Sequence, residues 1–205
     1  LMGITVIPFI PHRMSDGYGL SHEIAVSAKA QNIDLLITVD CGITAAAEVE
    51  TIKAQGIDVI IIDHHEPEEE IPKAIAVIDP KQPGCDYPFK GLAAVGLVAK
   101  TAQALMGELD EETFDLVAIG TVADMAPLRS ENRVFVKKGL SLIANSRNPG
   151  LRALLDVSRV DVKKLTPYHI GFILGPRINA AGRMDTAHTS LDLFLCEDTK
   201  QAYEL

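Results

Sequence analysis

Three side chains that can bind metal ions or move protons, Asp63, His64 and His65, come at the end of one apolar run. We predict a strand over residues 57–63, because the run is rich in isoleucine and valine, as in strands buried on both faces of a sheet. Carboxylates suit hard cations such as Mg²⁺, and added imidazole shifts the preference towards Mn²⁺ or another transition metal. Packing does not explain such a group at a strand end, so we expect chemistry there.

A second carboxylate, Asp40, ends another apolar run, residues 35–40, which turns through Cys41 and Gly42 into a helical pattern. A lone Asp after a strand is more often a helix cap than a ligand. In open α/β sheets, however, ligands bind in the crevice outside the carboxyl ends of the strands. Asp40, Asp63 and His64 would meet in that crevice, and together they favour a metal or phosphate site.

A third carboxylate, Asp124, ends the segment that starts at Gly120 and lies beyond a predicted apolar helix over residues 111–119. Because Pro127 follows it, Asp124 could simply mark the end of the helix. If that helix packs on the sheet edge, Asp124 can reach Asp40 and His64 and place two carboxylates and an imidazole around one cation.

Residues 11–21 follow a predicted strand and combine glycines with the donors His12 and Arg13. Glycine permits close backbone approach to a ligand, and such turns can bind phosphate or another oxyanion. The alternative is that Asp16 and Gly17 form an ordinary tight turn.

Residues 175–184 carry Arg177, Asn179 and Arg183 among small residues. Arginine can donate two parallel hydrogen bonds to phosphate oxygens, and asparagine adds a neutral donor, so the segment suits a phosphate chain. A helix–helix contact with solvated arginines explains the same pattern equally well.

The elements that must position these groups alternate between strand and helix. We predict strands over residues 4–10, 35–40, 57–63 and 74–78, and helices over 21–30, 44–55, 91–106, 111–119, 131–144, 151–155, 167–173 and 189–205. Strands joined by helical crossovers form a parallel sheet. We therefore expect an α/β fold, a parallel sheet with flanking helices over residues 1–128, followed by a helical connecting region over residues 129–205.

Composition sets further limits. The chain has 205 residues, 47% of them hydrophobic, and a net charge of −9, which suits a folded core and argues against indiscriminate binding to polyanions. Three widely separated cysteines, Cys41, Cys85 and Cys196, match neither a disulfide framework nor a zinc motif, so we expect a cytoplasmic protein. No apolar run approaches the ~20 residues of a membrane helix.

Three of these motifs, in this order, resemble the DHH phosphoesterase superfamily, which is named for the tripeptide at residues 63–65. They are residues 39–43, 63–65 and 120–124. Within the superfamily the chain is similar to the 5′ to 3′ exonucleases specific for single strands. That similarity rests on residues 10–20, 80–96, 127–133 and 175–184.

The resemblance implies a site with two Mn²⁺ or Mg²⁺ ions, in which Asp40 bridges the ions and His64 and Asp124 ligate one of them. His65 would lie beside the scissile phosphate. Asp63 would be the partner that orients a histidine.

The resemblance also implies single-stranded DNA as the substrate, an activity in DNA repair and recombination, and a helicase or a single-strand-binding protein as a candidate partner. The implied DNA contacts are Arg177, Asn179 and Arg183 on the backbone and Arg13, Asp16 and Tyr18 along the groove.

The chain departs from the family pattern in one respect: the family's first motif, Asp-x-Asp-Gly, is absent from it. We therefore expect a middle piece of a longer enzyme, with weak or no activity by itself. The first alternative is a phosphoesterase of the same superfamily that acts on short oligonucleotides, pAp or pyrophosphate. The second is a binding module that retains the fold, which the presence of Asp40, His64 and Asp124 disfavours.

Overall fold

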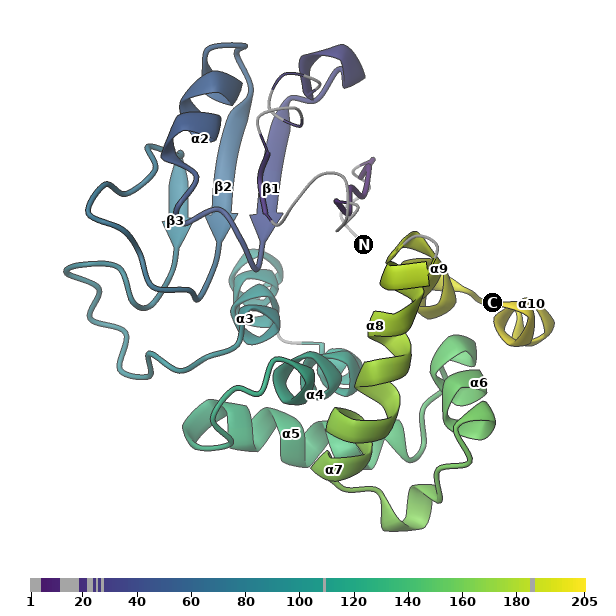
Figure 1. Cartoon of the computed structure of the whole chain (residues 1–205). Helices are drawn as coiled ribbons and strands as arrows, with labels where there is room; N and C mark the ends of the chain where they lie inside the picture. The colour runs from purple at the N-terminus through teal and green to yellow at the C-terminus, as the bar shows by residue number, and fades with distance from the viewer. Residues whose placement is uncertain are drawn as a thin grey trace.

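The computed structural model describes residues 5–11, 19–21, 24, 26, 28–108, 110–184 and 187–205, with only the backbone for 181–184 and 187. Within this part of the chain, one parallel sheet has the strand order β1-β2-β3. The strands are β1 (Leu35–Val39), β2 (Asp58–Ile62) and β3 (Ala76–Ile78). Figure 1 shows that all three point the same way and end at one edge, above α3 and α4. The expected α/β fold is confirmed.

Helices make up most of the remaining described chain. The longer ones are α2 (Ala46–Lys53), α3 (Ala94–Met106), α4 (Phe114–Ala123), α5 (Ser130–Ile143), α6 (Pro149–Val157), α8 (Gly175–Met184), α9 (Ala187–Leu195) and α10 (Thr199–Glu204). The short ones are η1 (Ala28–Gln31), η2 (Glu111–Thr113), η3 (Val162–Lys164), α7 (Pro167–His169) and the π-helix η4 (Ile170–Leu174). None in the described residues is long and apolar enough to cross a membrane.

The two faces of β2 pack against different helices, since successive side chains of a strand point to opposite sides. Val59 and Ile61 are buried in a cluster with Val49 and Ile52 of α2. Ile62 packs on the other face in a cluster that contains side chains of α3, α4 and α5. The end of β2, where Asp63 follows, is thereby held from both sides.

Apolar contacts continue across the predicted boundary at residue 128. Phe135 of α5 belongs to the same cluster as Ile62, and Val136 packs with Ala118 and Ile119 of α4. All described strands precede residue 79. The division into residues 1–128 and 129–205 stays a prediction.

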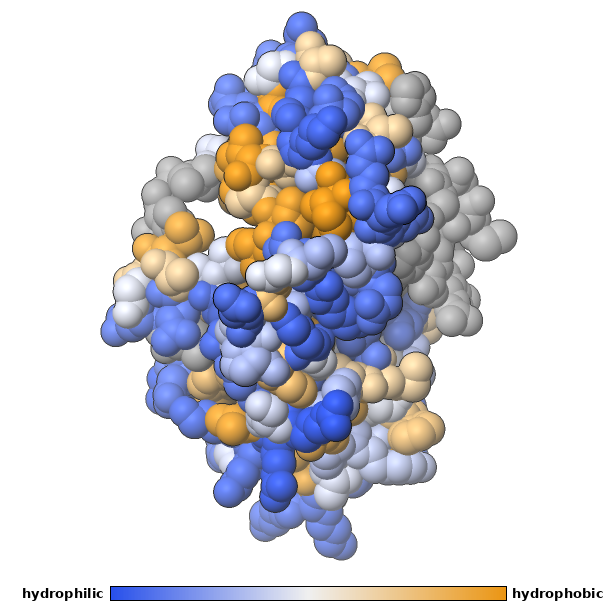
Figure 2. All heavy atoms as spheres, turned by 90° about the vertical axis from the view of Figure 1, so that its left-hand side faces the viewer, coloured by the Kyte–Doolittle hydropathy of each residue, from blue (hydrophilic) through white to orange (hydrophobic). Residues whose placement is uncertain are grey.

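Apolar and hydrophilic residues are unevenly distributed over the surface of the molecule (Figure 2). Figure 2 shows the side that the β3 edge faces: apolar residues gather in its upper part, over the sheet, and the lower, helical part is mostly hydrophilic. On the opposite edge, the β1 side chains Leu35, Ile37 and Val39 are exposed.

The predicted strand over residues 4–10 is wrong in its described part, because residues 5–10 have no regular secondary structure. Val6, Ile7 and Phe9 are exposed there. Strand propensity reflects how well a side chain fits a pleated, half-buried surface, and these three have no such surface around them.

The bounds of several helices also differ from the prediction. The helix over residues 189–205 is broken into α9 and α10, because the side chain of Asp198 caps α10 by accepting a hydrogen bond from the Gln201 N–H at 2.8 Å. The helix predicted over residues 44–55 is shorter at both ends, because α2 begins at Ala46 and ends at Lys53. Ser21, the first residue of the helix predicted over residues 21–30, accepts a hydrogen bond from the Ile24 N–H at 3.3 Å, as an N-cap residue does.

Candidate metal centre

Two strand ends deliver the central side chains. The Asp40 N–H donates to the Ile62 carbonyl at 2.9 Å, and the Asp63 N–H donates to the Ile78 carbonyl at 3.1 Å, so both residues extend the ladder of the sheet. Asp40 then leaves the strand with φ of +64°. This left-handed conformation is more accessible to Asp and Asn than to most residues, and it turns the chain out of the sheet.

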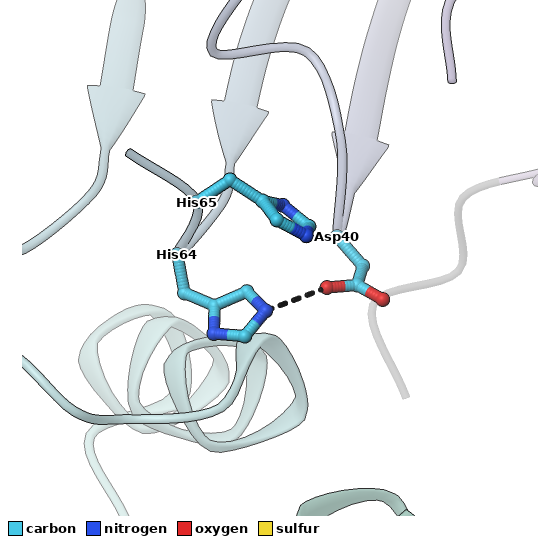
Figure 3. A group of neighbouring side chains, drawn as sticks. All are labelled: Asp40, His64 and His65. Carbon is cyan, nitrogen blue, oxygen red and sulfur yellow. Dashed lines mark ion pairs between the residues drawn. The ribbon is translucent and has the colours of Figure 1, made fainter. Parts of the chain in front are cut away.

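The side chains of Asp40, His64 and Asp124 converge on one nitrogen atom. His64 Nε2 lies 3.1 Å from Asp40 Oδ1 and 3.7 Å from Asp124 Oδ1. Asp124 is the C-cap residue of α4, as the sequence suggested. Figure 3 shows His64 and Asp40 pointing towards one another below the strand ends, with the ring of His65 between the strands.

His65 also belongs to this group. One ligand atom each from Asp40, His64 and His65 lies within 4.8 Å of the others. Asp124 approaches His64 but does not belong to this group of three residues. The sequence analysis instead led us to expect Asp124 as a metal ligand and His65 beside the phosphate. The roles of the four residues stay predictions.

Asp63 lies beneath the histidines and is almost fully buried, with 1% of its surface exposed. Its Oδ1 accepts hydrogen bonds from the His65 ring at 2.7 Å and from the His64 N–H at 2.7 Å, and its Oδ2 accepts one from the Ile43 N–H at 3.0 Å. Burial alone would raise the pKa of Asp63, but these hydrogen bonds outweigh it and hold the pKa below its ordinary value. Asp63 is therefore an ionised carboxylate that holds the His65 ring and the backbone of His64 and Ile43 in place.

The surroundings of His64 suit a cation. The close contact with the Asp40 carboxylate, 3.1 Å from Oδ1 to Nε2, is the main cause of the raised pKa of His64, with a further contribution from the charge of Asp124. Burial raises the pKa of Asp124. Asp40 Oδ1 and His64 Nε2 are both buried atoms without a hydrogen bond that meets the usual geometry. A carboxylate and an imidazole in this state fit a divalent ion.

A cleft of about 390 Å³ opens beside the group, lined by Gly19, residues 40–45, Asp63 and His65 among others. Gly42 shapes the turn, since it has φ of +109° and a Cβ there would lie 2.7 Å from Thr38 Oγ1. Burial and the charges of Asp63 and Asp40 raise the pKa of the Cys41 thiol to about 11. A pKa this high keeps the Cys41 thiol protonated near neutral pH.

The residues expected to contact DNA lie partly outside the described chain. Arg13, Asp16 and Tyr18 are not described, and neither is the side chain of Arg183. The other two, Arg177 and Asn179, are exposed on α8. Their DNA contacts stay predictions.

One carboxylate near the group was missed by the sequence reasoning. Asp79 follows β3 and is buried, with Oδ1 accepting a hydrogen bond from the Lys81 N–H at 2.7 Å and Oδ2 without a partner. Burial raises the pKa of Asp79. The signal was available, because Asp79 follows the third strand as Asp40 and Asp63 follow the first two.

Comparisons with known proteins agree with this architecture. Residues 1–121 match the model of the DHH family, N-terminal domain. The single-stranded-DNA-specific exonuclease RecJ of Bacillus subtilis is 45% identical over 197 residues, which are 96% of this chain and 25% of that protein. RecJ of Thermus thermophilus is 37% identical over 205 residues, which are 100% of this chain and 30% of that protein.

Solved structures show the same relationship. A crystal structure of exonuclease RecJ bound to manganese has a TM-score of 0.82 at 36% identity, over 97% of this chain and 51% of that one. RecJ of Thermus thermophilus in complex with Mn²⁺ has a TM-score of 0.77 at 33% identity, over 89% of this chain and 28% of that one. The chain spans a quarter to about a third of the length of these two curated relatives.

The expected resemblance is confirmed both by the family match and by the named relatives. The strand ends bring Asp40 and the two histidines together, and the family model matches more than half of the residues, so this chain belongs to the DHH family.

Proposed function

We propose that this chain is part of a metal-dependent phosphodiesterase that hydrolyses single-stranded DNA from the 5′ end. The observation that carries the proposal is the convergence of Asp40 Oδ1 and Asp124 Oδ1 on His64 Nε2, at 3.1 and 3.7 Å. Relatives named as single-stranded-DNA-specific exonucleases support the substrate. The direction of digestion follows from the resemblance.

Asp40, His64 and Asp124 would hold Mn²⁺ or Mg²⁺, the ions bound in solved RecJ structures. When bound, such ions activate a water molecule and neutralise charge on the reacting phosphate. The resemblance implies two ions, and within the described residues the structure offers one group of three neighbouring ligand residues.

His65 would act on the phosphate through its second ring nitrogen. Its Nδ1 lies 2.7 Å from the ionised Asp63, so Nδ1 carries a proton and donates it. Nε2 is then the ring atom that remains for the phosphate, and in the doubly protonated imidazolium form of His65 it would donate to a phosphate oxygen as negative charge develops. Asp63 itself would fix the ring and leave the reaction to His65.

DNA contacts by Arg13, Asp16, Tyr18, Arg177, Asn179 and Arg183 remain part of this proposal, as do a helicase or single-strand-binding protein as partner and a cytoplasmic location. Phosphate contacts of this kind make binding sensitive to salt.

The test compares Asp40→Asn with the wild type in the longest coding sequence that contains this chain. Asn tolerates the left-handed conformation of Asp40 but lacks the charge, so the fold should persist while Mn²⁺ affinity and hydrolysis of a 5′-phosphorylated strand fall at least 100-fold. Asp58→Asn, a change at the exposed start of β2, is the matched control. Retained Mn²⁺-dependent hydrolysis by Asp40→Asn would refute the assignment.

Two further measurements complete the test. The second candidate, a phosphoesterase for pAp, pyrophosphate or short oligonucleotides, predicts faster hydrolysis of a dinucleotide than of a long strand. Residues 1–205 alone, assayed in parallel, should show weak or no hydrolysis.

A further inference from the structure

Two exposed aromatic rings lie stacked on one another far along the chain from the candidate metal centre. The Tyr168 and Phe172 ring centroids are 5.0 Å apart, with 25° between the ring planes. Their exposed fractions are 61% and 71%, high for large aromatic side chains. We call Tyr168 and Phe172 the aromatic platform.

The segment that carries the aromatic platform is anchored in the helical core. Tyr168 lies in α7 and Phe172 in the π-helix η4, and π-turns occur frequently at functional sites. Ile170 and Leu174 on the same segment are fully buried in the helical core. The ring of His169 meets that of Tyr168 edge-on, with centroids 5.9 Å apart. The rings therefore face solvent from a rigid support.

The platform lies in a segment of positive charge. Residues 162–184 contain four Lys or Arg and no Asp or Glu, in a chain whose net charge is −9. Lys163 and Lys164 are exposed just before the platform and Arg177 just after it. Lys164 has a loose ion pair with Asp161 at 3.9 Å on exposed surface, which contributes little.

A protein partner would bind this surface mainly through its apolar area. A single nucleic-acid strand binds where exposed aromatic rings and cationic side chains occur together, as they do here. Bases stack on aromatic side chains whatever their sequence, and Lys and Arg contact the phosphates between them. Figure 1 shows the helical run starting at α7, at the bottom of the view, and α8 carrying it up towards the level of the strand ends.

We propose that Tyr168 and Phe172 stack bases of a single DNA strand, with Lys163 and Arg177 on its phosphates, as a contact independent of metal. The identity of the strand as DNA rests on the proposed function. This contact would hold the strand at a distance from Asp40 and His64.

The first experiment uses the absence of tryptophan from the chain. Within residues 1–205, Tyr168→Trp places the one tryptophan on the platform, and Tyr203→Trp places it on another exposed position; any tryptophan elsewhere in a longer protein is replaced by Phe in both variants. Titration with oligo-dT in EDTA should quench the fluorescence of Tyr168→Trp but not that of Tyr203→Trp. An abasic strand of equal length should quench neither.

The second experiment measures affinity for fluorescein-labelled oligo-dT by anisotropy, again in EDTA. Tyr168→Leu and Phe172→Leu keep apolar bulk but remove the ring face, so each should weaken binding about fivefold or more. Affinity for the abasic strand should not change. Tyr203→Leu is the matched control and should bind like the wild type.

Unchanged oligo-dT affinity in both platform variants, or equal quenching of the two tryptophans, overturns the proposal. A change in oligomeric state with unchanged affinity would show instead that the rings contact protein. EDTA removes the metal ions, so the binding experiments do not depend on hydrolysis. A platform variant can lose affinity for oligo-dT even if the protein proves unable to hydrolyse DNA. Equally, a platform variant can keep its affinity in a protein that does hydrolyse DNA.

Discussion

Asp63 Oδ1 lies 2.7 Å from His65 Nδ1, and the same oxygen accepts the backbone N–H of His64. One buried carboxylate thus fixes the ring of His65 and the backbone of His64, the two histidines of the motif that names the family. The hydrogen bond from Ile43 to its other oxygen also ties the turn after β1 to the end of β2. Asp63 is therefore structural support for the site as well as part of it.

Asp63→Asn should impair both stability and catalysis. An amide accepts fewer hydrogen bonds than a carboxylate and carries no charge, and hydrogen bonds to charged groups contribute roughly 1.5–3 kcal/mol each. We expect a lower melting temperature and a roughly 10–100-fold loss of hydrolysis or Mn²⁺ affinity, as for other residues that orient a metal-binding histidine.

Thermal unfolding and Mn²⁺ titration check this prediction. Asp58→Asn at the exposed start of the same strand should leave both measurements unchanged. A variant with wild-type stability and affinity would show that Asp63 does not orient the histidines.

Gly139→Ala should destabilise the helical part of the protein strongly. A Cβ at Gly139 of α5 would collide with the Phe114 carbonyl oxygen and with the Ala118 Cβ of α4. Since the first contact is with backbone, the helices must move apart, and overpacking of this kind costs about 1–3 kcal/mol or more.

Denaturant unfolding measures this cost. Gly171→Ala is the control, because its Cβ would lie 3.5 Å from Val122 Cγ1, an ordinary contact. If the two alanine variants unfolded at the same denaturant concentration, close packing of α4 on α5 would not be the reason for glycine at position 139.

Asp115→Asn should stabilise the protein near neutral pH. Burial raises the pKa of Asp115 above its ordinary value of 3.8, although the Leu116 N–H and the Ser146 hydroxyl donate to its oxygens. A raised folded pKa means that the extra stability exists below the unfolded pKa, where the carboxyl is protonated, and is lost as pH rises through the folded pKa. Asparagine is neutral at every pH and avoids that loss.

Melting temperatures from about pH 3 to pH 7 provide the measurement. The advantage of Asp115→Asn should be largest at neutral pH and shrink as the pH falls. The exposed Asp86→Asn should show no such trend. A constant difference across the range would mean that the ionisation of Asp115 is not the cause.

Several features could be predicted from the sequence because local patterns determine them. The Ile-rich run before Asp63, the strand before Asp40 and the capping Ser21 follow from propensity and short-range hydrogen bonding, and the structure has all three. Residues 5–10 show the limit of this reasoning. They have strand composition, yet a strand exists only where a neighbouring surface accepts it.

The sequence by itself determined which chemical groups follow which strands, since that order is covalent, and the DHH resemblance that follows from it. Only the tertiary structure decided that Asp124 and Asp40 lie at one nitrogen of His64, and that His65 is bound by Asp63. It also revealed the buried Asp79 and the exposed Tyr168 and Phe172. Distances between residues far apart in the chain, and exposure to solvent, depend on how the helices pack on the sheet, and no local pattern encodes that packing.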